Sequence, residues 1–460
     1  MADAYDVVVV GAGTGGYSTA LRAAQLGRRV AIVERDDRLG GTCLLRGCIP
    51  TKALLQSAAV MDTVNRAEEW GIKASGDPDW SAVRAFEDKI VDKLVKGVTG
   101  LIKTRGIAVF RGTAKLVAGP AVEVDGTKID AEDVVIATGS RPRLLSGVEL
   151  TERIITSDEA LRYDRIPSSA VVIGAGAVGL EFASLYRSLG AEVTLLEALP
   201  TLAPLEDEDV SAEIAKAFRR RGIKTAAGAS VKGVTDTGEA VDIIFEAEGG
   251  ADKVTADICL IAIGRGPVIE GLGLEEAGVS LHEKGFVNVD GQLRTNVEHV
   301  WAVGDVAATP LQLAHVAFTE GYAVAERMAG ETVPDIDYIN IPRVTYCSPE
   351  IASVGLTAAQ AKDRGHKLAT EHLDFRGIGK ANILGEGGFV KVVSEQDGGP
   401  VLGVHMIGPH VIDLIAEAML ITNWEAVPAE VAALFHPHPS LSEAIGEAHL
   451  ALAGKPLHTA

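Results

Sequence analysis

One pattern of glycines, apolar runs and a closing glutamate occurs twice in the chain. The first copy, DVVVVGAGTGGYSTALRAAQLGRRVAIVER, begins at Asp6, and the second, AVVIGAGAVGLEFASLYRSLGAEVTLLEA, begins at Ala170. In each copy an apolar run of strand length precedes a Gly-rich turn, a helical pattern follows, and a second β-branched run leads to Glu34 or Glu197. This order predicts a βαβ unit with a buried parallel sheet, and its recurrence predicts two such units.

The repeated glycines have the spacing of a dinucleotide-binding turn. Each matched pair lies 163 positions apart, and the pairs join Gly11, Gly13, Gly16 and Gly27 to Gly174, Gly176, Gly179 and Gly190. In such a turn the first glycine allows the tight reversal, the second admits a pyrophosphate to the helix N-terminus, and the third lets helix and strand pack closely. The later acid accepts hydrogen bonds from a ribose. Two Gly-rich turns in ordinary α/β domains are the alternative, which the shared spacing disfavours.

The length of 460 residues exceeds what one hydrophobic core supports. We predict an α/β protein with two Rossmann-like dinucleotide-binding domains and a C-terminal α+β domain. Residues 1–145 would form the first part of one dinucleotide-binding domain, 146–265 the other, and 266–340 the part that completes the first. In 341–460, PRVTYCSPEIASVGLT, FVKVVSE and PVLGVHMIG resemble antiparallel strands followed by helices. VNRAEEW and AFEDKIVDKLVKGVTGLIK are typical of amphipathic helices.

Charge and cysteine content restrict the class of protein. A formal net charge of −20 argues against general affinity for nucleic acid or an anionic membrane. No apolar run approaches the roughly 18 residues of a spanning helix, and the acidic start MADAYD does not resemble a secretory signal. Four cysteines suit a reducing compartment. We therefore expect a cytoplasmic protein.

Two of the four cysteines, Cys43 and Cys48, stand close together in GGTCLLRGCIPTK, directly after the first βαβ pattern. A zinc site would require further cysteines or histidines at ligand spacing, and none lies nearby. Along a regular helix five residues rise about 7.5 Å, more than a disulfide tolerates, so a redox pair requires a distorted turn that Gly47 would permit. The following helix would favour thiolate on Cys48. Lys52 lies one helical turn beyond Cys48 on the same face. It either acts on whatever Cys48 faces or is an ordinary solvated lysine.

Sulfurs that exchange electrons require an adjacent acceptor, and the first Gly-rich turn is the adjacent one. A carrier that takes electrons from a thiolate and passes on a hydride is a flavin, so we predict a flavin there. The second turn would then bind the nicotinamide cofactor. Glu197 favours NAD, because a 2′-phosphate requires a nearby arginine and EALPTLAPLEDED contains neither Arg nor Lys.

A histidine cluster near the C-terminus, in FHPHPSLSEAIGEAHL, supplies a candidate base. Dithiol chemistry requires one, because a thiol of ordinary pKa near 8.5 is only a few per cent thiolate near pH 7. His436 and His438 are the candidates, and Glu443 would hold the base. Ser440 and Glu443 also have the spacing of a capping box that opens the last helix, so Glu443 is open to both roles, and either histidine is open to a purely structural one.

The motifs GAGTGG, GGTCLLRGCIPTK, ATGS, GAGAVGLE, VGD, QLAH and HPHPSLSE occur in the order seen in the flavin-dependent pyridine nucleotide–disulfide oxidoreductases. The chain resembles this family over nearly its whole length. It is most similar to the branch that reoxidises dihydrolipoyl-lysine of 2-oxoacid dehydrogenase complexes. The resemblance implies electron transfer from a dithiol through a Cys43–Cys48 disulfide and FAD to NAD⁺.

The resemblance also implies a role for each matching residue. Cys43 would meet the substrate, Cys48 would face the flavin, His438 would be the acid and base, and Glu443 would orient it. The residues expected to bind the cofactors are Gly11, Gly13, Gly16, Glu34, Thr42, Lys52, Thr138, Gly139, Ser140, Asp305, Gln312, Leu313, Ala314 and His315 for FAD, and Gly174, Gly176, Gly179, Glu181, Glu197 and Gly264 for the second domain, with Lys52 paired to Glu181. No metal is expected.

The resemblance implies a homodimer built by the C-terminal domain, because His438 would act on the disulfide of the other subunit. The implied partners are the lipoyl and subunit-binding domains of an acyltransferase core. LLRG departs from the usual LNVG between the cysteines, so the effect of Arg46 on the sulfurs stays open. A reductase of small thiol disulfides and a non-catalytic flavoprotein subunit are the competing interpretations.

Overall fold

The computed structural model describes residues 5–117 and 119–458. The described chain forms two compact units. The first contains residues from 1–54, 81–143 and 264–338, and the second contains those from 55–80, 144–263 and 339–460. Among the described residues, none of the helices has the length and apolar content needed to cross a membrane. The predicted division at 145/146, 265/266 and 340/341 stays a prediction.

The first unit is built on a seven-stranded sheet. Its parallel strands, in spatial order, are β3 (Ala108–Arg111), β2 (Val30–Glu34), β1 (Tyr5–Val10), β6 (Thr127–Ile136) and β17 (Val300–Ala302). The first half of β6 also continues an antiparallel meander with β5 (Ala121–Val124) and β4 (Ala114–Val117). Side chains from both faces of β1 are buried, which explains its uninterrupted valine run.

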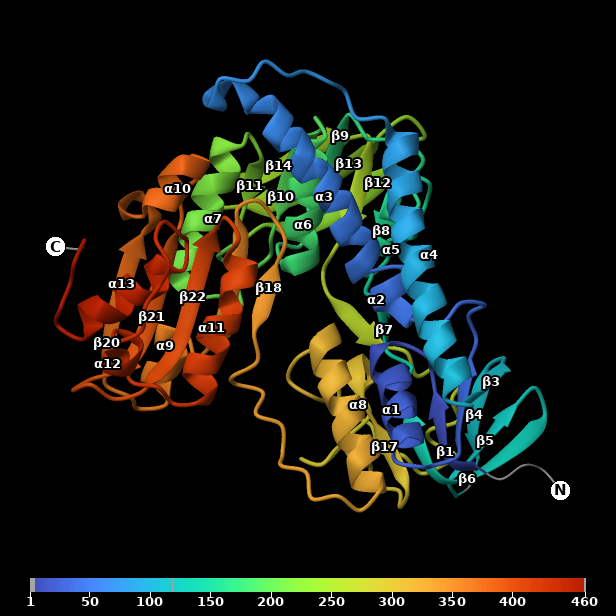
Figure 1. The fold of residues 1–460 in the computed structure, drawn as a ribbon. Helices are drawn as coiled ribbons and strands as arrows, with labels where there is room; N and C mark the ends of the chain where they lie inside the picture. Colours follow the sequence, from blue (N-terminus) through green and yellow to red (C-terminus); the bar gives the residue numbers. More distant parts are fainter. Residues whose placement is uncertain (1–4, 118, 459–460) are drawn as a thin grey trace. The chain divides into compact units, whose positions relative to one another are not determined.

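Helix α1 (Thr14–Gln25) connects β1 to β2 and packs against α8 (Ala314–Met328), as Figure 1 shows. The approach of the two helices requires Gly321, because a Cβ there would lie 2.3 Å from Oγ of Ser18. The strand, turn, helix and strand therefore follow one another as the first repeat predicts.

After β2 the chain forms α2 (Gly41–Leu45), α3 (Cys48–Asn65) and, further on, α4 (Trp80–Thr104). The prediction of an amphipathic helix over VNRAEEW is wrong, because α3 ends at Asn65 and only a short 3-10 helix, η1 (Ala67–Trp70), follows. Arg66, between them, leaves helical geometry at φ −104° and ψ 3°. Gly71 ends η1 at φ +77°.

The second unit contains the second repeat. A five-stranded parallel sheet has the order β11 (Lys224–Ala226), β10 (Glu192–Leu196), β9 (Ser169–Ile173), β15 (Ile258–Ile261) and β8 (Ile154–Thr156). Helix α6 (Ala177–Ser188) joins β9 to β10, and α7 (Glu208–Arg220) precedes β11. A separate antiparallel sheet comprises β12 (Ser230–Asp236), β13 (Val241–Ala247) and β14 (Gly250–Ala256).

The same unit contains the antiparallel sheet of the C-terminal region. Its order is β18 (Arg343–Thr345), β19 (Glu350–Gly355), β22 (Val401–Gly408), β21 (Phe389–Glu395) and β20 (Leu368–Asp374). Helices α11 (Val411–Asn423), α12 (Pro428–Val431) and α13 (Glu443–Leu452) share an apolar core with this sheet. Two Rossmann-type parallel sheets and a C-terminal α+β region confirm the predicted fold class.

A row of polar side chains crosses the C-terminal sheet. Ser353 pairs in register with Arg343 and with His405, and His405 pairs with Lys391. Residues directly opposite one another point to the same face, so these four side chains lie together. The start of α7 meets them: Lys391 Nζ lies 2.7 Å from Oδ1 of Asp207. Lys391 and His405 are both buried, and this face of the sheet therefore packs through charge as well as apolar area.

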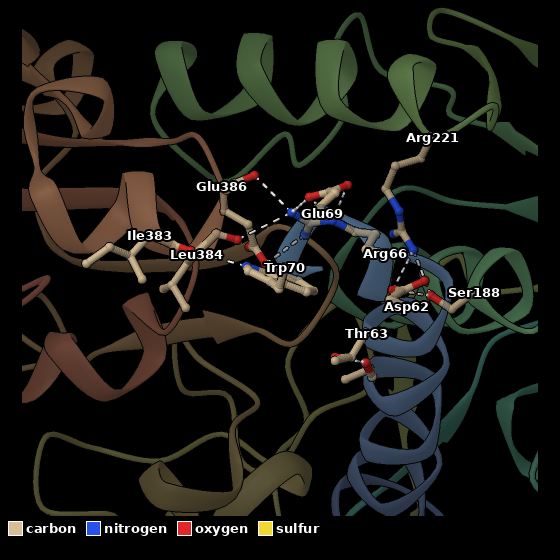
Figure 2. Close-up of polar contacts among 12 residues, drawn as sticks. Asp62, Thr63, Arg66, Glu69, Trp70, Ser188, Arg221, Ile383, Leu384 and Glu386 are labelled. Atoms are coloured by element: carbon tan, nitrogen blue, oxygen red, sulfur yellow. Dashed lines mark hydrogen bonds and ion pairs between the residues drawn. The ribbon is translucent and has the colours of Figure 1, made fainter. Parts of the chain in front are cut away.

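Polar contacts hold the end of α3 within the second unit. Arg221 Nη2 lies 3.1 Å from Oδ2 of Asp62, which also accepts a 2.7 Å hydrogen bond from Oγ of Ser188. Arg66 Nη1 lies 3.2 Å from Oε1 of Glu386. Figure 2 shows these contacts, in which Asp62 and Arg66 point toward different segments. The helix that begins at Cys48 is thus fixed at its far end.

Candidate active site

The first Gly-rich turn has the backbone that a bound diphosphate requires. Gly11 has φ +101°, and a Cβ on Gly16 would lie 1.9 Å from the carbonyl oxygen of Gly11. Helix α1 begins after Gly13, which supplies no capping side chain. The N-terminal amides of α1 are therefore not covered by a side-chain cap, which fits the phosphates of FAD.

Glu34 ties this turn to the loop after β2. Its Oε2 accepts the Ala12 amide at 2.7 Å, and its Oε1 accepts the Asp36 amide at 2.9 Å. Burial raises the pKa of Glu34, against the lowering effect of backbone hydrogen bonds from Ala12 and Arg35. Each carboxylate oxygen can accept a second hydrogen bond, so the contacts are compatible with a ribose at this position.

The second turn repeats this arrangement atom for atom. Gly174 has φ +104°, and a Cβ on Gly179 would lie 1.8 Å from the carbonyl oxygen of Gly174. Gly176 precedes α6 without a side-chain cap. Glu197 accepts the amides of Ala175 at 2.6 Å and Leu199 at 2.8 Å. The second turn therefore fits a second dinucleotide.

The two neighbouring cysteines lie on either side of a break between helices. Cys43 belongs to α2, Cys48 is the first residue of α3, and Arg46 and Gly47 separate them. The glycine is needed, because a Cβ at Gly47 would lie 2.9 Å from the carbonyl oxygen of Thr42. The distortion that the spacing requires is therefore an interruption of the helix rather than a bent first turn.

Cys43 and Cys48 are not joined by a disulfide in this structure. A hydrogen bond with the side chain of Cys48 raises the pKa of Cys43, and burial and the charge of Cys48 raise it further, while Lys52 lowers it. The sulfur of Cys48 is the partner in this hydrogen bond. That sulfur lies at the positive N-terminus of α3.

Asp305 lies in the short helix η2 (Gly304–Val306), directly after β17. Its Oδ2 accepts a 2.6 Å hydrogen bond from Oγ of Ser140, and its carbonyl oxygen accepts Nε2 of Gln312 at 3.3 Å. Leu313 precedes α8 and offers no side-chain cap to the amides of Ala314 and His315. Polar side chains therefore gather at the carboxyl end of the sheet of the first unit, where α/β proteins bind cofactors.

Thr138 and Gly139, which were also predicted to bind FAD, belong to the first unit. Thr138 donates its hydroxyl to the carbonyl oxygen of Val268 at 2.7 Å, and Gly139 has φ +71°. Gly264, which was predicted for the second dinucleotide-binding domain, lies in the first unit at φ +106°. Glu181, in the second unit, is buried and accepts the amide of Tyr346 at 3.0 Å. Its pairing with Lys52 stays a prediction.

Two residues of this site were missed by the sequence analysis. Arg265 donates from Nε to Oγ of Ser140 at 2.7 Å, so it supports the hydroxyl that contacts Asp305. Tyr17, in α1, has its pKa raised to about 12 by burial and by the charges of Cys43 and Tyr322. Its position directly after the third glycine of the first turn was the available signal.

Nδ1 of His438 lies 2.8 Å from Oε1 of Glu443, while Oε2 of Glu443 accepts the amide of Ser440 at 2.8 Å. The predicted capping box, in which Ser440 opens the last helix, is wrong. Helix α13 begins at Glu443, and the residue before it is Ser442. The hydroxyl of Ser440 meets Oγ of Ser442 at 2.9 Å instead. Slight burial opposes ionisation, but the hydrogen bonds from Ser440 and His438 lower the pKa of Glu443.

His436 faces a different acid. Its Nε2 lies 2.7 Å from Oε1 of Glu417 in α11, and this hydrogen bond raises the pKa of His436. A Cβ on Gly446 would lie 2.4 Å from Nδ1 of His436, so the ring packs tightly against α13. By contrast the side chain of His438 is 79% exposed. Of the two histidines, His438 is the one accessible to a substrate.

Two dinucleotide-binding folds and a neighbouring thiol pair define a class of redox enzyme that exchanges electrons between nucleotide cofactors and thiols. Residues 5–321 match the family described as pyridine nucleotide-disulphide oxidoreductase, and residues 341–449 match its dimerisation domain. The chain belongs to the pyridine nucleotide-disulphide oxidoreductase family. This finding confirms the family resemblance seen in the sequence.

Individual relatives match along their whole length. The chain is 43% identical to a dihydrolipoyl dehydrogenase of Bacillus subtilis, with all of both chains covered. It is 40% identical to a dihydrolipoyl dehydrogenase of Thermus scotoductus, covering 99% of this chain and 98% of the relative. The solved structure of LpdA from Mycobacterium tuberculosis is similar with a TM-score of 0.89 and 27% identity, covering 97% of this chain and 99% of that one.

Proposed function

We propose that the protein is a dihydrolipoyl dehydrogenase that uses FAD and NAD⁺ to reoxidise dihydrolipoyl-lysine. The observation that carries this proposal is the hydrogen-bonded pair of Cys43 and Cys48 at the N-terminus of α3, beside the first dinucleotide-binding turn. Full-length similarity to dihydrolipoyl dehydrogenases supports the same activity. Glu197, followed through residue 209 by no Arg or Lys, supports NAD over NADP.

The thiol chemistry begins with the oxidised Cys43–Cys48 pair. His438, oriented by Glu443, takes a proton from one substrate thiol. The thiolate attacks the sulfur of Cys43, so a substrate–Cys43 bond forms and the Cys43–Cys48 bond breaks. The second substrate thiol then attacks the sulfur bound to Cys43, which closes the cyclic disulfide of the product and leaves both cysteines reduced. The two electrons lost by the substrate therefore reside on Cys43 and Cys48.

Residues of the first unit would hold FAD: the amides of the Gly11–Gly16 turn for the diphosphate, Glu34 for a ribose, and Asp305 with Ser140 at the carboxyl end of the sheet. Bound FAD would accept the electron pair of the cysteines and return it as hydride to NAD⁺. The turn of Gly174–Gly179 with Glu197 would hold NAD⁺. Lys52 would support the negative charge on Cys48 from the next turn of α3.

The match to a dimerisation domain indicates a homodimer. His438 would then act on the partner subunit's Cys43. The chain would serve a 2-oxoacid dehydrogenase complex in the cytoplasm, through the lipoyl and subunit-binding domains of the acyltransferase core. The division into three domains, with boundaries at 145/146, 265/266 and 340/341 and with 266–340 completing the first domain, belongs to the same proposal.

A steady-state comparison of two substrate pairs tests the function. Dihydrolipoamide with NAD⁺ should be turned over at least about 100-fold faster, in kcat/KM, than glutathione disulfide with NADPH, because residues 197–209 offer no Arg or Lys to a 2′-phosphate. Preference for the second pair would identify a reductase of small thiol disulfides. Absence of turnover with both pairs, in protein that retains FAD, would identify a non-catalytic flavoprotein.

A further inference from the structure

Arg46 lies between the two cysteines, and its side chain turns to an acid outside their loop. Its guanidinium forms an ion pair with Oδ2 of Asp36, in the segment that follows β2. The side chains of Arg46 and Asp36 are 34% and 28% exposed. The positive charge is therefore compensated at a partly buried site. Lys52 is the cation that lowers the pKa of Cys43.

Asp36 is itself held in place by its backbone. Its amide donates to Oε1 of Glu34 at 2.9 Å, and its carbonyl oxygen accepts Nη1 of Arg111 at 2.5 Å. The other oxygen of Glu34 accepts the amide of Ala12 at 2.7 Å. A continuous set of contacts therefore runs from the first dinucleotide-binding turn through Glu34 and Asp36 to Arg46.

A second attachment lies on the other side of Cys43. The amide of Gly40 donates to the carbonyl oxygen of Ala12 at 2.9 Å, and a Cβ on Gly41 would lie 2.5 Å from Cα of Gly13. The backbone of the cysteine loop thus rests on the dinucleotide-binding turn at its start. Arg46 provides the attachment at its end, where α2 stops and the two-residue break begins.

We propose that Arg46 is a positioning residue whose ion pair with Asp36 fixes the break between α2 and α3, and with it the approach of the Cys43 and Cys48 sulfurs. This inference rests on the proposed redox role of the two cysteines. The alternative is that Arg46 acts on the thiols through its charge. The two accounts make different predictions for the two partners of the ion pair. Loss of the Arg46 side chain and loss of the Asp36 carboxylate remove the same contact. The first loss removes a positive charge near the thiols, whereas the second removes a negative charge.

The test uses the FAD-loaded enzyme and the variants Arg46→Met and Asp36→Asn. Arg38→Met is the matched control, because Arg38 lies in the segment of Asp36 between β2 and α2 but pairs with Asp92 in α4 at 2.6 Å. The first readout is the equilibrium between disulfide and dithiol at Cys43 and Cys48 in a buffer of reduced and oxidised dithiothreitol. The second is the pH midpoint for alkylation of Cys43 in the reduced enzyme. Retained FAD and an unchanged Tm identify correctly folded variants.

Both variants should shift the equilibrium toward the dithiol by about threefold, in the range of a partly exposed ion pair, and their alkylation midpoints should agree with the wild type. The double variant should shift no further than either single one. Exchange of the two charges, Arg46→Asp with Asp36→Arg, should restore part of the disulfide. Arg38→Met should behave as the wild type.

Midpoints that move upward in Arg46→Met and downward in Asp36→Asn would overturn the positioning role in favour of a charge effect. An unchanged disulfide equilibrium in both variants would also overturn it, while the proposed function would stand. A wild-type enzyme that forms no Cys43–Cys48 disulfide in this buffer would overturn the proposed function, and this inference with it.

Discussion

Nδ1 of His438 and Oε1 of Glu443 are 2.8 Å apart, and the second oxygen of Glu443 accepts the amide of Ser440. The backbone thus orients the carboxylate, and the carboxylate orients the imidazole. Engagement of Nδ1 leaves Nε2 to meet a substrate. One oxygen of Glu443 therefore orients His438, and the other is held by the backbone amide of Ser440.

His438→Gln should lower kcat by about 10²–10⁴-fold, the range of one general base, while FAD remains bound. The matched control is His366→Gln, since His366 also faces a carboxylate through Nδ1, that of Glu395 at 3.4 Å. Steady-state oxidation of dihydrolipoamide measures the effect. Equal rates in His438→Gln and the control would exclude His438 as the base.

Cys48→Ala should lower the pKa of Cys43. The hydrogen bond to Cys48 and the charge of Cys48 both raise that pKa, and the substitution removes them while Lys52 remains. Alkylation of Cys43 at increasing pH, followed by mass spectrometry, should therefore show a lower midpoint than in the reduced wild type. A midpoint at or above the wild-type value would contradict the hydrogen-bonded pair.

Gly16→Ala and Gly179→Ala should separate the two cofactors. Each added methyl would meet a carbonyl oxygen at less than 2 Å, that of Gly11 or Gly174 respectively. Gly16→Ala should be purified without FAD, whereas Gly179→Ala should retain FAD and bind NAD⁺ at least about tenfold more weakly. Gly100→Ala, with open space around the new methyl, is the control. Loss of the same cofactor in both variants would contradict the assignment.

His405 should contribute to acid destabilisation. Burial lowers the pKa of His405, although Asp207 and Glu206 oppose this effect. As the pH falls, the unfolded chain therefore binds a proton at His405 before the folded chain does. The contribution of neutral His405 to the free energy of unfolding is fully present above the ordinary histidine pKa of about 6.5. This contribution is lost as the pH falls below that value. Between about pH 7.5 and 5.5, Tm should fall roughly 3 °C less in His405→Gln than in the wild type.

The control for this titration is His282→Gln at an exposed position of the first unit. The slope of Tm against pH is the relevant quantity, because His405→Gln also alters the 2.9 Å contact of Nε2 with the carbonyl oxygen of Leu356. Parallel slopes in His405→Gln and the wild type would assign the acid sensitivity to other groups.

The repeated βαβ units were predictable because their requirements are local. Gly16 and Gly179 are required because a backbone carbonyl of the same turn lies too close for a side chain. Glu34 and Glu197 each accept an amide at the same separation along the chain. The thiol pair was predictable for the same reason, since its spacing excluded a regular helix.

Contacts between distant segments were not predictable. The ion pair of Arg46 with Asp36 joins two side chains that the sequence presents as ordinary surface charges. Arg265 reaches Ser140 only because two short strands, β7 (Ser140–Pro142) and β16 (Arg265–Pro267), pair across the first unit. Strand β20 lacks a clear alternation of apolar residues and takes its place from pairing with β21.

The central claim is that the electrons of the substrate pass through Cys43 and Cys48. The direct measurement is an anaerobic reaction of the oxidised enzyme with a stoichiometric amount of dihydrolipoamide, without NAD⁺, followed by rapid alkylation and mass spectrometry. New label should appear on Cys43 and Cys48 together, while the buried Cys259 and Cys347 stay unlabelled. Production of NADH after addition of NAD⁺, with Cys43 and Cys48 unlabelled beforehand, would contradict the account.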